Sequence, residues 1–275
     1  MRSSKLFKIQ PLIRKQMNSL QTLSVGGASL QENRELTSVQ SYSPKEVFFC
    51  PEESQFYSQC LDRMVLNRCT SSDLVIEFGS GDGSPVIHSL LRTPFKGKIQ
   101  GYELTSTASK LAQSRISQYG LSDKYIVRNQ CFFEGWEQSG ANYLIANPPY
   151  LPAPDNDIYM PSLHGGADGA EITKLLFTVG CDRVLSLISA YSNPVETIEY
   201  AIDRGYQVID FTISPLQFGY YSSESKVRET ISALKSDRKA FYSPNIYLLA
   251  GVLFEKQGQG SQDLSAELLQ VMTAF

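Results

Sequence analysis

Four consecutive residues near the middle of the chain, Asn147-Pro148-Pro149-Tyr150, have the types and order needed to position a nucleophile. They follow the apolar run 142–146, which predicts a buried strand, and the two prolines end it because neither has an N–H to donate. Proline also holds the residue before it in an extended conformation. Asn147 and the Pro148 carbonyl could then accept both hydrogens of a planar NH2 group while Tyr150 stacks on its plane, which leaves the nitrogen lone pair free to attack. The alternative is an ordinary proline-rich turn after a core strand.

A glycine-rich loop upstream of this motif predicts a ligand site between a strand and a helix. Its strand is the apolar run 74–78, and Pro85 suits the first turn of the helix that follows. Three alternate positions of the loop are glycines, which let the backbone approach a ligand closely: Gly79, Gly81 and Gly83. The spacing G-x-G-x-G differs from the dinucleotide pattern G-x-G-x-x-G. With Glu77 just before the loop and Asp82 within it, the sequence favours a ligand with a cationic centre over a pyrophosphate.

Glu103 ends the next predicted strand, 98–102, and lies 20 residues after Gly83. A carboxylate at that position of a nucleotide-binding fold accepts two ribose hydroxyls. The alternative is an exposed acid at a strand end. Ligands of such sheets bind outside the carboxyl ends of the strands, so the glycine loop, Glu103 and the Asn147 shelf should meet there. An adenosine ligand with a cationic sulfonium, next to a device that holds NH2, predicts methyl transfer to nitrogen.

The order of the predicted elements indicates an α/β fold. Strands are predicted over 74–78, 98–102, 124–127, 142–146, 184–190, 207–213 and 246–254. Helices are predicted over 52–68, from Pro85, and over 105–119 and 195–203, and the segment 165–179 is predicted to start as a loop and become a helix. Strands that alternate with helices predict a mostly parallel sheet with helices on both faces.

The chain divides into three predicted segments. Residues 1–42 form a flexible leader without Asp or Glu in its first 31 residues, which is typical of an organellar transit peptide or of a disordered basic tail. Residues 43–256 form the main domain, with an insertion over 216–245 between the last two strands. Residues 257–275 form a polar linker and a short amphipathic helix that could pack on the domain or extend from it.

Composition excludes several classes of protein. No run of about 18 apolar residues exists, so no transmembrane helix is expected. A net charge of −3 and a pI of about 5.5 argue against a protein that wraps nucleic acid. Five cysteines without C-x-x-C spacing and only two histidines argue against a metal site and predict reduced thiols. We expect a soluble protein of a reducing compartment: chloroplast or mitochondrion if the leader is a transit peptide, otherwise the cytoplasm.

The glycine loop, Glu103 and the motif 147–150 together resemble class I S-adenosylmethionine-dependent methyltransferases. The segment 147–152 (NPPYLP), followed by 163–169 (LHGGADG), is similar to the HemK/PrmC branch, whose members methylate a glutamine side-chain amide in translation release factors. The resemblance spans about 48–256. It implies a Rossmann-like seven-stranded, mostly parallel sheet with helices on both faces and an antiparallel last strand, and S-adenosylmethionine as cofactor.

The resemblance also assigns roles to single residues. The catalytic positions would be Asn147, Pro148 and Tyr150. The cofactor-binding positions would be Glu77, Gly79, Gly81, Asp82, Gly83, Glu103, Cys131, Phe132 and Asn147. Asp168 is expected to cap the following helix, and His164 to be a loop residue.

The chain departs from the family pattern in three places. Cys131 stands where the family has an acid that contacts the adenine amino group, so adenine recognition would rest on Phe132 and backbone groups. Lys174 replaces an expected arginine. Fewer than 50 residues precede the core, where the bacterial enzymes carry a helical domain that reads the release factor.

These patterns predict an enzyme that methylates a planar amino or amide nitrogen, with a protein glutamine as the favoured acceptor. A nucleic-acid adenine or guanine amino group, stacked on Tyr150 as a flipped base, is an alternative. A small molecule enclosed by 216–245 is another, and a non-enzymatic scaffold with the methyltransferase fold is a fourth. The sequence predicts no membrane partner and does not indicate an oligomeric state.

Overall fold

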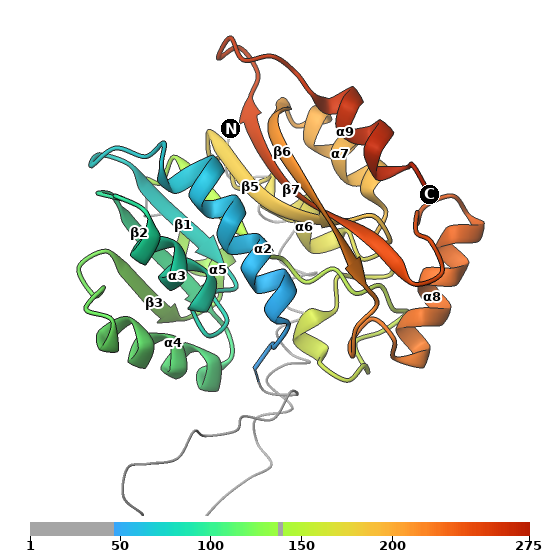
Figure 1. The fold of residues 1–275 in the computed structure, drawn as a ribbon, viewed down its shortest axis with the longest axis horizontal. Coiled ribbons are helices and arrows are strands. Elements are labelled where there is room, and N and C mark those ends of the chain that lie inside the picture. Colours follow the sequence, from blue (N-terminus) through green and yellow to red (C-terminus); the bar gives the residue numbers. More distant parts are fainter. Residues whose placement is uncertain (1–46, 137–139) are drawn as a thin grey trace, which may run out of the picture. The chain divides into compact units, whose positions relative to one another are not determined.

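The computed structural model describes residues 47–136 and 140–275, so the predicted leader over 1–42 lies outside the described residues. The described part of the chain is built on a seven-stranded sheet in the order β3-β2-β1-β4-β5-β7-β6 (Figure 1). The strands are β1 Leu74–Phe78, β2 Lys98–Glu103, β3 Tyr125–Asn129, β4 Tyr143–Ala146, β5 Arg183–Ser189, β6 Tyr206–Gln217 and β7 Ile246–Lys256. The last strand, β7, runs antiparallel to both β5 and β6, and the pairs among β1 to β5 are parallel. The predicted α/β fold with an antiparallel last strand is confirmed.

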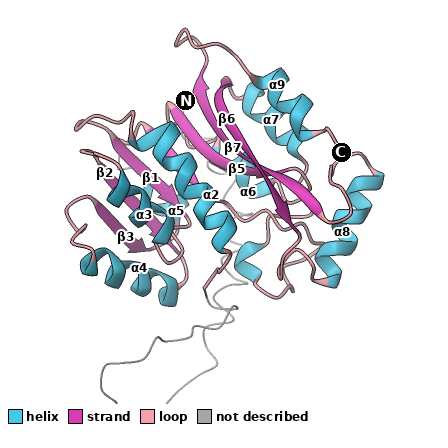
Figure 2. Cartoon of the chain, viewed as in Figure 1, coloured by secondary structure: helices cyan, strands magenta, loops and turns pink. Residues whose placement is uncertain are grey.

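Helices cover both faces of the sheet (Figure 2). They are α2 Pro51–Leu61, α3 Ser84–Arg92, α4 Ser106–Gln118, α5 Phe132–Gly135, α6 Glu171–Leu176, α7 Pro194–Asp203, α8 Ser225–Ser236 and α9 Ser265–Met272. Because side chains alternate along a strand, β1 sends Val75 to a core beneath α2, α3 and α4 and Ile76 to a core beneath α6, α7 and α9. None of the helices in the described ranges has the length and apolar character needed to cross a bilayer.

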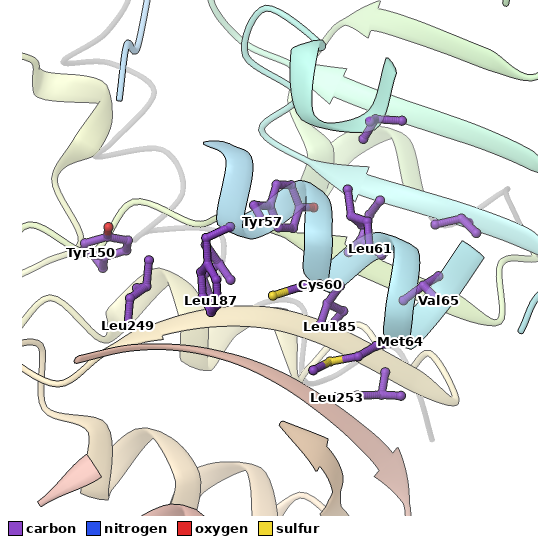
Figure 3. Close-up of a cluster of buried hydrophobic side chains, with 14 of the residues drawn as sticks. Tyr57, Cys60, Leu61, Met64, Val65, Tyr150, Leu185, Leu187, Leu249 and Leu253 are labelled. Carbon is purple, nitrogen blue, oxygen red and sulfur yellow. The ribbon is translucent and has the colours of Figure 1, made fainter. Parts of the chain in front are cut away.

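Helix α2 precedes the first strand and packs across β5 and β7. Its buried face carries Tyr57, Cys60 and Leu61, which Figure 3 shows above the strands. A side chain at Gly251 of β7 would clash with the sulfur of Cys60, so the glycine allows the helix to approach the sheet closely. The π-helical turn Asp62–Leu66 extends α2 and buries Met64 as well. These contacts fix the position of the first turn of α2, which the candidate site uses.

The structure corrects several predicted boundaries. β6 stays paired with β7 as far as Gln217, beyond the predicted end of this strand at 213, and the segment between the two strands contains a helix, α8. The segment 165–179 does start as a loop, over 165–170, and its helix is α6. The short helix α5 was not predicted. The C-terminal helix α9 packs against α7 and β6, which decides between the two positions left open for it.

Candidate active site

The carboxyl ends of three parallel strands meet at one edge of the sheet. In the register, Phe78 at the end of β1 is aligned with Tyr102 of β2 on one side and with Ala146 of β4 on the other. The residues that follow these three are Gly79, Glu103 and Asn147. The sheet therefore brings the glycine loop, the predicted ribose acid and the proline-rich shelf to a common edge.

The three loop glycines have different surroundings. All have positive φ, at 68° for Gly79, 55° for Gly81 and 75° for Gly83, a region that residues with a Cβ rarely adopt. A Cβ added at Gly79 or Gly81 would meet no atom within 4 Å, whereas one at Gly83 would lie 3.2 Å from the Cβ of Ala112 in α4. Gly79 and Gly81 thus border open space, and Gly83 permits α3 to pack on α4.

Glu103 joins the glycine loop to the loop after β2. Its carboxylate accepts the backbone N–H of Gly81 at 2.9 Å and the backbone N–H of Thr105 at 2.7 Å. Burial raises the pKa of Glu103, and these hydrogen bonds to its charged form oppose the rise. The acid predicted to bind ribose therefore lies directly beside the glycine backbone.

Glu77 lies beneath the loop, with only 2% of its surface exposed. The hydroxyl of Tyr125 donates to its carboxylate, and burial raises the pKa of Glu77 to about 7. A side chain at Gly101 of β2 would clash with the hydroxyl of Ser80 and lie 3.1 Å from the Glu77 carboxylate, so this glycine makes room for both. The structure thus places Glu77 in the floor of the glycine loop.

Three other predicted cofactor residues have protein partners of their own. Asp82 pairs with Arg115 of α4 and accepts the N–H of Ser84 at 3.0 Å, at the start of α3. Phe132 is 3% exposed and sits in an aromatic cluster, with its ring centroid 5.4 Å from that of Tyr102. Cys131 is buried next to it, and burial raises the pKa of its thiol. Their observed contacts hold α3 and α5 in place.

A buried acid on α2 holds the side chains of the proline-rich shelf. Asn147 donates its Nδ2 hydrogen to Oε1 of Glu53 at 2.7 Å, and the hydroxyl of Tyr150 donates to Oε2 of the same carboxylate. The other amide atom, Oδ1 of Asn147, is buried and has no hydrogen-bond partner among the described residues. The Tyr150 ring is itself buried and packs edge-on against Tyr191 at 5.8 Å between centroids. The shelf thus presents one unpaired amide oxygen.

The glycine-rich segment downstream fixes the backbone of the shelf. A Cβ at Gly165 would lie 2.6 Å from the Cα of Tyr150, and a Cβ at Gly169 would clash with the carbonyl oxygen of Tyr150. Ser192, which follows β5, donates its hydroxyl to that same carbonyl at 2.7 Å. These close approaches explain why the segment after the shelf contains glycines.

The side chains of that segment make structural contacts. Asp168 accepts the N–H of Ala170 at 2.9 Å and the side-chain amide of Asn193 at 2.6 Å. α6 has no side-chain N-cap, so the prediction that Asp168 caps it is wrong. Nε2 of His164 lies 3.0 Å from the carbonyl oxygen of Ala153, in the same loop region.

Glu53 was missed by sequence reasoning, although the sequence holds a signal for it. The apolar positions of α2 recur at helical spacing, and stepping back one turn from Tyr57 reaches Glu53. An acid on the buried stripe of a helix is rarely found without a partner. That signal could have indicated a buried polar contact, but it could not have named Asn147 and Tyr150 as the partners.

Comparisons with known proteins give partial matches. No family model matches the chain. The chain is 23% identical over 163 residues to counting factor-associated protein A of Dictyostelium discoideum, a match that covers 52% of this chain and 70% of that protein. It is 25% identical over 107 residues to a ribosomal protein uL3 glutamine methyltransferase of Bordetella pertussis, and the match covers 36% of each. The chain therefore spans about a third of the length of the Bordetella protein.

Solved structures give a broader match. A Pyrococcus horikoshii protein described as an RNA methyltransferase superposes with a TM-score of 0.51 and 14% identity, over 81% of this chain and 94% of that one. A likeness at this identity concerns the fold alone. Together with the strand order, it shows that the described part of this chain has the Rossmann-like fold of class I S-adenosylmethionine-dependent methyltransferases.

Proposed function

We propose that this chain is an S-adenosylmethionine-dependent N-methyltransferase that acts on a planar NH2 group, with a protein glutamine side chain as the acceptor. The observation that carries the proposal is Oδ1 of Asn147, a buried acceptor without a partner among the described residues. Leaving such an atom unpaired costs on the order of 1–3 kcal/mol, so a ligand that supplies the missing donor is the natural explanation. An NH2 group supplies that donor.

The residues at the sheet edge fit the cofactor. Open space borders Gly79 and Gly81, and Glu103 lies against that backbone with lone pairs left for ribose hydroxyls. These residues and the loop backbone would hold S-adenosylmethionine, which when bound supplies an electrophilic methyl group on a sulfonium sulfur.

The shelf would position the acceptor nitrogen. Oδ1 of Asn147 and the Pro148 carbonyl would each accept one N–H, which orients the nitrogen and leaves its lone pair unshared. Positioning of this kind supplies much of the rate of a methyl transfer, so no strong base is required. Tyr150, whose hydroxyl binds Glu53, would support the shelf from within the core.

The charges around the shelf favour a polypeptide over a nucleic acid. The loop that follows the shelf carries Asp155 and Asp157, and Lys226 of α8 is already paired with Asp155 at 2.8 Å. Asp157 is exposed on this rim, whereas Glu224 is buried and accepts the backbone N–H of Tyr159 in the same loop at 2.6 Å. Such a rim repels phosphates. The partial similarity to the Bordetella glutamine methyltransferase also supports a protein acceptor.

A nucleic-acid amino group is the second candidate, and one observation favours it. Tyr159 and Tyr220 are both exposed and stack at 5.2 Å between centroids, at the edge of the loop that follows the shelf. Exposed aromatic rings can stack on unpaired bases.

Labelled-methyl transfer tests the proposal and separates the candidates. Wild-type protein and Asn147→Ala would be incubated with methyl-labelled S-adenosylmethionine and a dialysed extract of the source cells, then treated with protease or ribonuclease. We expect label that protease releases, that is recovered as methylated glutamine, and that Asn147→Ala does not produce. Label released by ribonuclease would establish the second candidate, and no label in any fraction would overturn the enzyme.

A further inference from the structure

We infer that Glu53 is a positioning residue: it fixes the side-chain amide of Asn147 with the oxygen toward the acceptor, and so makes the shelf selective for NH2 groups. The inference rests on the proposed function for the identity of the acceptor group, but the orientation of Asn147 can be tested without any acceptor. Glu53 itself touches neither acceptor nor cofactor in this account, because its carboxylate binds Asn147 and Tyr150.

Hydrogen-bond chemistry determines the orientation of the amide. An ionised carboxylate can only accept, so the amide atom that faces it must be the NH2 nitrogen of Asn147. If the amide were reversed, its oxygen would face Oε1 of Glu53 at the same short distance, and two acceptors would repel each other. The contact therefore leaves Oδ1 as the amide atom without a partner among the described residues.

Two features of α2 hold the carboxylate in place. Glu53 lies in the first helical turn, after Pro51, where the helix dipole favours a negative charge. One and two turns further on, Tyr57 and Cys60 are buried against the sheet, so the helix cannot rotate Glu53 away without exposing them (Figure 3). The carboxylate is 6% exposed, so water competes little for its lone pairs.

A fixed acceptor at this place would discriminate between similar substrates. A glutamine amide can donate to Oδ1 of Asn147, whereas a glutamate carboxylate would bring a second acceptor to the same atom. A site built around one hydrogen-bonding pattern rejects the isostere that lacks it much more strongly than an apolar pocket does. If Asn147 could turn over freely, its NH2 would accommodate the carboxylate and the discrimination would fall.

Glu53 is the group near the shelf whose protonation would change this contact. The negative charge of Glu53 raises the pKa of the four tyrosines and one cysteine that surround it: Tyr150, Tyr191, Tyr221, Tyr247 and Cys50. Burial raises the pKa of each of these groups, so they stay neutral at neutral and acidic pH. Burial also raises the pKa of Glu53, and once protonated it can donate to Oδ1 and release the amide.

The side-chain amide resonances of Asn147 report this contact directly. Full-length protein would be labelled with ¹⁵N-asparagine, and the Asn147 signals would be identified by their loss in Asn147→Ala. We expect them to shift in one titration as pH falls. Asn142 gives an internal comparison, because its amide donates to Asp73. Burial acts to raise the pKa of Asp73, but hydrogen bonds from Thr70 and Asn142 outweigh it, so the net pKa is lowered. The Asn142 signals should therefore titrate at a lower pH than those of Asn147.

Matched variants separate Glu53 from its neighbours. Glu53→Gln should abolish the Asn147 titration and leave that of Asn142 intact, whereas Glu52→Gln, which removes the exposed acid next to it, should change neither. Tyr150→Phe removes a donor that stabilises the ionised Glu53, so the Asn147 titration should move to higher pH. The inference would be overturned if the Asn147 signals did not change with pH in the wild type, or if they still titrated in Glu53→Gln.

Kinetics with the labelled acceptor provide a second readout. Glu53→Gln should lower kcat/KM for the acceptor roughly tenfold, the effect of one charged hydrogen bond, with the affinity for S-adenosylhomocysteine unchanged. In an Asn147→Ala background the same substitution should cost nothing more, because the residue it acts through is gone. Additive losses would indicate a merely structural role. If no acceptor is methylated but the Asn147 titration is observed, the proposed function fails while the positioning contact stands.

Discussion

Two buried acids lie under the two halves of the candidate site, and each receives the hydroxyl of a tyrosine. Glu77 lies under the glycine loop and binds Tyr125, and Glu53 lies under the proline-rich shelf and binds Tyr150. Burial raises the pKa of both carboxyls. The two differ in origin: Glu77 belongs to β1 within the sheet, while Glu53 is brought by α2, from outside it.

The difference shows how the two halves are built. In the glycine-loop half, two strands of the same sheet, β1 and β3 on either side of β2, place Glu77 and Tyr125, so the acid supports a loop that the sheet already positions. In the shelf half, Asn147 and Tyr150 come from the end of β4, and a helix far away in sequence supplies their common partner. We therefore expect changes at Glu77 to act mainly on stability and changes around Glu53 to act mainly on the acceptor.

The largest expected effect is a pH-dependent gain of stability in Glu77→Gln. The folded pKa of Glu77 is raised from 4.5 to about 7. The contribution of this group to the free energy of unfolding is therefore fully present below pH 4.5 and is lost as pH rises through 7. A shift of that size corresponds to about 3 kcal/mol. Urea unfolding should give the variant a higher free energy of unfolding than the wild type at pH 8 but not at pH 5. An equal difference at both pH values would contradict the buried ionisation.

Asn147→Ala should have the largest effect on catalysis. We expect kcat/KM for the acceptor to fall roughly 100-fold, as when one preorganised hydrogen-bonding group is lost from an active site. The free energy of unfolding should also fall, by about 1.5–3 kcal/mol if Glu53 is ionised, because the side-chain amide of Asn147 donates to that buried carboxylate. Steady-state kinetics with labelled methyl groups measure the first quantity and urea titration the second. A wild-type kcat/KM in this variant would show that Asn147 does not position the acceptor.

A pair of Tyr→Phe variants sharpens the comparison between the halves. Tyr125→Phe and Tyr150→Phe each remove one hydrogen bond to a buried carboxylate and keep the ring, at a cost of about 1.5–3 kcal/mol if the carboxylate is ionised. Only Tyr150→Phe should also change the kinetics of the acceptor. Binding of S-adenosylhomocysteine and kcat/KM, measured on both variants, should therefore diverge. Identical kinetic profiles would mean that the two acids have the same role.

Much of the fold was predictable because it depends on residues that are close together in the sequence. β1 has the predicted bounds, and Pro148 and Pro149 end β4 as their chemistry requires. The bulk of the site was less predictable, since its contacts join distant residues. Asp82 was assigned to the cofactor from its place in the loop, but its partner Arg115 lies on another helix. Glu53 could be recognised as a buried acid, yet only the packing of α2 on the sheet brings it to Asn147.

Calorimetric titration with S-adenosylhomocysteine tests the division into two halves most directly. The wild type should bind it, Glu103→Ala should lose most of that affinity, and Asn147→Ala should keep it. This pattern would place the cofactor on the glycine loop and leave the shelf to the acceptor. An absence of binding in the wild type, or a loss in Asn147→Ala as large as that in Glu103→Ala, would contradict the account.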